Sequence, residues 1–160
     1  MTRTLTLLIS LALATAATAD TPSYRLYYSM AIDPDDSHVR ASVRVAQSNA
    51  ELREVKFEPD ERRFHSFEAD SDLSRDGDRY VWSVPADGGT LSWVATATNQ
   101  RRSKRYDARI TDDWALFRGE DVFPAMASVA RRGAVSKASL SVDAPRGWSV
   151  LTPFEEDDGR

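Results

Sequence analysis

The chain has 160 residues, a formal net charge of −4 at pH 7 and no cysteine. Without cysteine there are no disulfide bonds, thiolate metal sites or cysteine nucleophiles, so a hydrophobic core must supply the stability alone. The length suits one domain, and the mild acidity argues against nucleic acid and anionic membranes as partners.

The first twenty residues, MTRTLTLLISLALATAATAD, have the pattern of a secretory signal peptide. Arg3 supplies a positive n-region, residues 5–13 an apolar h-region, and Ala17-Thr18-Ala19 a small-residue cleavage site. The apolar run is too short for a spanning helix, which needs about 20 residues. We expect removal of residues 1–19, with an uncleaved anchor as the alternative. Residues 20–160 would then form one exported domain, periplasmic or extracellular, without a membrane partner.

Two strands are predicted directly after the signal peptide. Residues 24–32 are rich in aromatic and branched side chains, and the turn residues around Pro34 end this segment. Residues 38–47 then alternate strictly, with Val39, Ala41, Val43 and Val45 on one face. This period of two predicts a half-buried antiparallel strand.

Further short strands are expected along the rest of the chain. They cover residues 52–59, stopped by Pro59, with Val55 and Phe57 inward, then 63–69, 79–84, and 90–98 with Leu91 and Trp93 inward. Two more cover residues 136–145, with Ala138, Leu140 and Val142 on one face, and 147–151. Eight or nine strands with turn signals every 8–12 residues predict an all-β fold, an antiparallel β-sandwich with at most one short helix. The acidic end of the sequence, residues 155–158, looks truncated, as if a further segment followed it.

The stretch DDWALFRGEDVFP, residues 112–124, is the one helical candidate. Asp112 could cap a short helix that turns Trp114 and Phe117 toward the core, with Gly119 just past its end. Its large apolar side chains would close the sandwich. A second interpretation makes Trp114, Phe117, Arg118 and Phe123 a contact surface, because such residues favour interfaces. A catalytic role is the third and weakest.

A basic cluster, with Arg101, Arg102 and Arg105, lies between two predicted strands. It has no interleaved aromatic residues, which argues against nucleic acid. A solvated hairpin tip is the first interpretation. A docking patch for an acidic partner and a proteolytic site are the alternatives.

The segment Asp72-x-Ser74-x-Asp76-Gly77 matches the first half of a calcium loop. Asp72, Ser74 and Asp76 would supply oxygen ligands, but Ser83 occupies position twelve, where a bidentate glutamate is needed. An Asp-Gly hairpin without metal is the alternative for the same residues.

Catalytic signatures are missing from the sequence. The two histidines, His38 and His65, form no His-Glu-x-x-His motif, and no serine lies in a Gly-x-Ser-x-Gly elbow. A zinc site built from both histidines and a distant carboxylate stays open as a weak hypothesis. We therefore expect no cofactor and assign no catalytic residue, and an autonomous hydrolase is disfavoured.

From Tyr106 onward, the order RYDARITDDWALFRGEDVFP, ASLSVDAP and RGWSVLTPF resembles the amino-terminal β domain of the glycyl aminopeptidase family of zinc metallopeptidases. Pro145, Gly147, Trp148, Val150 and Thr152 match that family's element preceding its catalytic domain, and residues 24–45 are similar to its opening strand pair. The family's Trp-x-Pro-Gly-Ser-Tyr element is replaced here by VKFEPDERRFHSF, and the 160 residues contain no His-Glu-x-x-His motif of that family's catalytic domain. The resemblance thus implies a β domain that packs against a peptidase domain, and no catalytic residue.

Two functions follow as expectations. In the first, the chain is a non-catalytic exported β-sandwich domain that packs against or supports a peptidase domain. In the second, it is a free-standing periplasmic binding module for a protein, peptide or glycan. The sequence leaves the ligand and the oligomeric state open.

Overall fold

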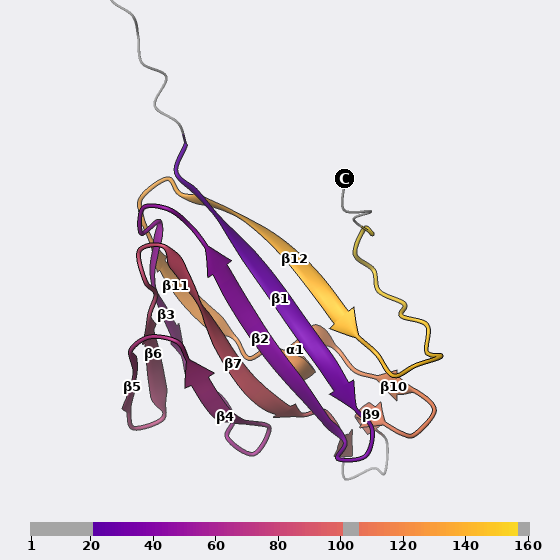
Figure 1. Cartoon of the computed structure of the whole chain (residues 1–160). Coiled ribbons are helices and arrows are strands. Elements are labelled where there is room, and N and C mark those ends of the chain that lie inside the picture. The colour runs from indigo at the N-terminus through magenta and orange to yellow at the C-terminus, as the bar shows by residue number, and fades with distance from the viewer. Residues whose placement is uncertain (1–20, 101–105, 157–160) are drawn as a thin grey trace, which may run out of the picture.

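The computed structural model describes residues 21–100 and 106–156, and these residues form an all-β fold with one short helix (Figure 1). A five-stranded sheet has the order β12-β1-β2-β7-β4. Its strands are β1 (Ser23–Asp33), β2 (His38–Ala46), β4 (Phe64–Ala69), β7 (Gly88–Thr96) and β12 (Val135–Asp143).

A four-stranded sheet, in the order β11-β3-β6-β5, faces the first across the core. Its strands are β3 (Leu52–Phe57), β5 (Leu73–Asp76), β6 (Arg79–Ser83) and β11 (Met126–Ala130). A small third sheet contains β8 (Asn99–Gln100), β9 (Tyr106–Ile110) and β10 (Ala115–Leu116), and α1 (Gly119–Val122) follows it. The described residues thus contain more strands than the eight or nine expected, because several are short.

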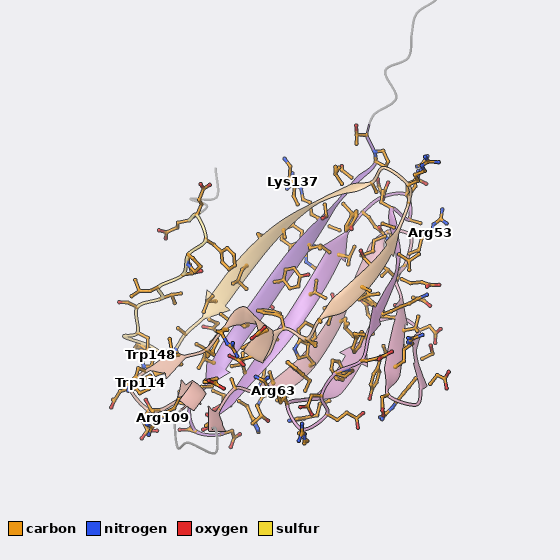
Figure 2. The ribbon with its side chains drawn as sticks, turned by 180° about the vertical axis from the view of Figure 1, so that it is seen from behind. Arg53, Arg63, Arg109, Trp114, Lys137 and Trp148 are labelled. Atoms are coloured by element: carbon orange, nitrogen blue, oxygen red, sulfur yellow. The ribbon has the colours of Figure 1, made fainter. Side chains whose placement is uncertain are left out.

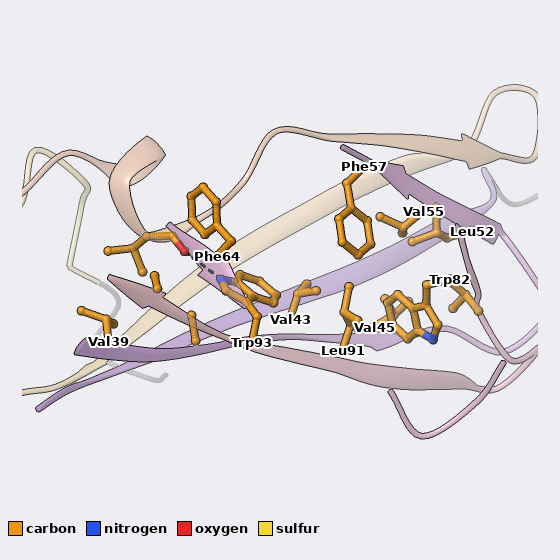
Figure 3. Packing of buried hydrophobic residues seen from close by; sticks show 14 of the residues in the cluster. Val39, Val43, Val45, Leu52, Val55, Phe57, Phe64, Trp82, Leu91 and Trp93 are labelled. Atoms are coloured by element: carbon orange, nitrogen blue, oxygen red, sulfur yellow. Dashed lines mark hydrogen bonds between the residues drawn. The ribbon is translucent and has the colours of Figure 1, made fainter. Parts of the chain in front are cut away.

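The alternation seen in the sequence explains which face of the five-stranded sheet is buried. Val39, Ala41, Val43 and Val45 of β2 are all buried, and Leu91 and Trp93 lie opposite Val43 and Ala41 on β7. Val55 and Phe57 of β3 face them from the other sheet (Figure 3). The predicted inward faces of these strands are therefore confirmed, and the two sheets share one hydrophobic core.

A chain of ring contacts crosses that core. Phe57 stacks on Tyr80 with ring centroids 5.2 Å apart and lies 4.9 Å from Phe67. Phe67 in turn packs against Trp93, which meets Phe123 edge-on at 5.9 Å. Such pairs contribute about 0.5–1.5 kcal/mol each beyond the area they bury, so they tie both sheets and the segment after α1 together.

One strand pair within the predicted sandwich is parallel and one predicted strand is absent. β1 pairs with β12 in parallel, from Ser23 opposite Val135 to Ala31 opposite Asp143, while the other pairs between described strands are antiparallel as expected. β12 follows β11, a strand of the other sheet, and takes the edge position beside β1. Residues 147–151, expected to be a strand, form no strand.

Candidate functional site

Residues 112–124 fold differently from the helix expected there. The turn between β9 and β10 is closed by Thr111: its N–H donates to the Trp114 carbonyl at 2.9 Å, and its hydroxyl accepts from the Trp114 N–H at 3.1 Å. The helix begins at Gly119, where it was expected to have ended. Because the turn uses this hydroxyl as its acceptor, Asp112 is left at an exposed hairpin tip.

The segment is anchored by a buried carboxylate in α1. Asp121 has no exposed surface and accepts a hydrogen bond from the Arg118 N–H at 2.9 Å. It also forms an ion pair with Arg63, whose guanidinium comes from the β3–β4 connection, while Arg118 reaches Asp121 and Glu120. A buried charge needs such partners, so this cluster fixes α1 to the sandwich.

The aromatic residues of the stretch divide into two groups. Phe117 and Phe123 are partly buried against the core, with Phe123 also 5.3 Å edge-on from Tyr28. The Trp93 indole N–H donates to the Val122 carbonyl at 2.8 Å (Figure 3). Trp114 instead is 47% exposed and does not turn inward as expected. Of the four proposed contact residues, Trp114 alone presents a large apolar surface, since Arg118 is engaged in ion pairs.

Exposed large apolar side chains nevertheless lie on β10 and its preceding turn and on the segment that follows β12. Leu116 is 69% exposed beside Trp114, and the extended segment after β12 exposes Val150, Leu151 and Phe154. Figure 2 shows Trp114 and Trp148, at the start of that segment, at the same end of the structure. The Arg109 guanidinium lies 5.7 Å from the centre of the Trp114 ring. We call Trp114, Leu116, Val150, Leu151 and Phe154 the apolar end.

The predicted calcium ligands lie on a β-hairpin. β5 and β6 pair from Leu73 opposite Trp82 to Asp76 opposite Arg79, so Gly77 and Asp78 form a two-residue turn. These residues thus lie in the hairpin given as the alternative, and ligation of calcium by Asp72, Ser74 and Asp76 stays a hypothesis.

The histidines are brought together although they are 27 positions apart in the sequence. The rings of His38 and His65 meet edge-on with centroids 5.6 Å apart, and the His65 Nδ1 is 3.0 Å from the Ser66 hydroxyl. No third histidine, cysteine, aspartate or glutamate completes a metal-binding group in the described part of the chain. Arg101, Arg102 and Arg105 lie outside the described residues, between the paired strands β8 and β9.

Sequence reasoning missed a second surface, the outer face of the five-stranded sheet. Arg44 of β2 lies with its guanidinium 4.1 Å from the centre of the Tyr27 ring on β1. A hydrogen bond with Arg25, helped by the positive charges of Arg25 and Arg44, lowers the pKa of Tyr27. The signal was present in the sequence as polar residues alternating with the buried ones, but only strand pairing brings them together.

Compared with known proteins, the chain matches no protein-family model and no curated protein sequence. The resemblance to the glycyl aminopeptidase family therefore rests on its short sequence elements alone. Within the described residues, no helix has the length and apolar character needed to cross a membrane.

Proposed function

We propose that this chain is a non-catalytic β-sandwich domain that docks another protein domain against its apolar end. The proposal is supported by the number of exposed large apolar side chains on these two segments, because exposed apolar surface beyond scattered single residues marks interaction sites on soluble proteins. Of the seven such side chains among the described residues, five belong to the apolar end. Leu151 has 97% of its surface exposed, so covering it would remove a large apolar area from water and contribute favourably to the free energy of docking.

The resemblance to the glycyl aminopeptidase family suggests the occupant, a peptidase domain. The segment that resembles the family's element before its catalytic domain, from Pro145 to Thr152, is part of the same exposed end. In this proposal the aromatic and aliphatic side chains form the contact, while α1 and its buried carboxylate hold β10 in place.

The test compares two double variants of the full chain. Leu116→Ser with Leu151→Ser removes apolar surface from the apolar end, and Val129→Ser with Val135→Ser removes exposed apolar side chains elsewhere, on β11 and β12. We expect the unmodified chain to bind an apolar fluorescent dye and to self-associate in sedimentation velocity runs. The first variant should lose both properties and the second should keep them.

Equal dye binding and self-association of the two variants would contradict the proposal. The apolar end would then contribute no more to either property than exposed apolar side chains elsewhere. A chain that stays monomeric and binds no dye would favour the alternative, a free-standing binding module.

A further inference from the structure

The outer face of the five-stranded sheet is open to solvent. Figure 1 views the sheet from this side, and no other described element lies in front of it. Because side chains alternate along a strand, the residues between the buried positions of β1, β2, β7 and β12 all point to this face.

One corner of this face collects positive charge. Strand pairing places Arg25 opposite Lys137 of β12, and Tyr27, the next outward residue of β1, opposite Arg44. Among the ion pairs between described residues, none involves Arg25, Arg44 or Lys137. Arg40, two outward positions from Arg44 along β2, differs because Asp33 lies 3.8 Å from it. We call Arg25, Tyr27, Arg44 and Lys137 the cationic corner.

Hydroxyl groups adjoin the cationic corner. Ser29 and Ser42 are paired across β1 and β2 with their oxygens 2.7 Å apart, and Ser141 is paired with Ser29 from the other side. Together with Thr90 and Ser139 they line a shallow hollow of about 280 Å³ that also includes Tyr27 and Arg44. No carboxylate lines this hollow, so it offers hydrogen bonds and positive charge side by side.

We propose that the cationic corner and its hydroxyl-lined hollow bind an anionic polysaccharide. The sulfate or carboxylate groups of the polymer would contact Arg25, Arg44 and Lys137. Charge-assisted hydrogen bonds from basic side chains to such anions are roughly twice as strong as hydrogen bonds between neutral groups. The serine and threonine hydroxyls would exchange hydrogen bonds with sugar hydroxyls, and both groups can donate and accept. The open, flat face suits a linear polymer that crosses several strands.

The same face fits other anionic partners less well. A protein interface needs a broad apolar centre, whereas the hollow, although it includes Tyr27, Tyr28 and Leu140, is lined mainly by hydroxyl groups and Arg44. Stable binding at a membrane surface takes apolar insertion in addition to positive charge, and this corner has only three basic side chains. An extended peptide adds to a sheet at its edge strand, whereas this site lies on the face.

The experiment measures binding of the full chain to dextran sulfate and to unsulfated dextran of the same length by isothermal titration calorimetry. We expect the sulfated polymer to bind at least tenfold more tightly and its binding to weaken as salt is raised. Arg25→Gln and Arg44→Gln should each weaken binding roughly tenfold, about the effect of one charge-assisted hydrogen bond. Arg40→Gln is the matched control, because it removes the same charge from the same face of β2, and it should change affinity less than about twofold.

Three results would overturn the proposal. Equal losses in Arg40→Gln and Arg44→Gln would mean that net charge alone attracts the polymer. Equal binding of sulfated and unsulfated dextran would remove the role of the anion, and tighter binding of poly-glutamate would identify an acidic polypeptide instead. Leu116→Ser with Leu151→Ser should bind dextran sulfate like the unmodified chain, so this proposal and the docking proposal can fail separately.

Discussion

Asp121 is the residue on which the end of the sandwich depends. Its carboxylate is fully buried, whereas the side chain of Arg63 keeps 27% of its surface exposed. The Arg63 Nη2 makes the ion pair with Asp121, whereas the Arg63 Nε is, among the described residues, buried without a hydrogen-bond partner. Removing one member of a buried pair leaves the other charge uncompensated.

Asp121→Asn should therefore lower the free energy of unfolding by about 3 kcal/mol, at the low end for a buried pair because Arg63 is partly exposed. Urea denaturation measures this change. Glu120→Gln is the control: Glu120 pairs with Arg118 at the surface, and its loss should cost less than about 1 kcal/mol. Similar midpoints for the two variants would show that Asp121 does not anchor α1.

At the scale of elements, the start of β7 depends on close backbone contact. Gly88 lies opposite Ala46 with a φ of +102°, and a Cβ added there would lie 2.2 Å from the Val45 carbonyl oxygen. Gly77, in the β5–β6 turn, also has a positive φ, of +59°, but no atom lies within 4 Å of an added Cβ. Both glycines therefore need a positive φ, and Gly88 has in addition a close contact with the neighbouring strand.

We expect Gly77→Ala to destabilise the fold by about 1–2 kcal/mol, the cost of a left-handed backbone for alanine. Gly88→Ala should cost about 1–3 kcal/mol more, because β2 and β7 must move apart to admit the methyl group. Thermal unfolding followed by circular dichroism compares them. If Gly88→Ala were no worse than Gly77→Ala, the close approach of the two strands would not be required for stability.

At the scale of the whole molecule, the two candidate surfaces are built from different elements. The apolar end is built from β10 and residues 150–154, whereas the cationic corner is built from β1, β2 and β12. Neither surface carries a nucleophile with a base or a complete set of metal ligands. The two histidines meet as a pair on the sheet and lack the His-Glu-x-x-His spacing of a zinc peptidase.

We therefore expect the full chain to hydrolyse no aminoacyl p-nitroanilide, with or without added Zn²⁺. The measurement is release of p-nitroaniline from glycyl and alanyl substrates, with a chelator-treated sample as the control. Activity that requires zinc and disappears in His38→Ala or His65→Ala would show that the histidine pair belongs to a catalytic site.

The sequence alone determined the all-β class and the buried faces of the central strands, because a period of two survives in the order of residues whatever the strands pair with. Tertiary structure alone decided that β12 pairs parallel with β1, that Asp121 meets Arg63, and that Arg25, Tyr27 and Arg44 form one corner. It also decided that Trp114 points outward while Phe123 packs inward. Alternation reveals which side of a strand a residue takes, but pairing and register, which arise from contacts between distant segments, determine its neighbours.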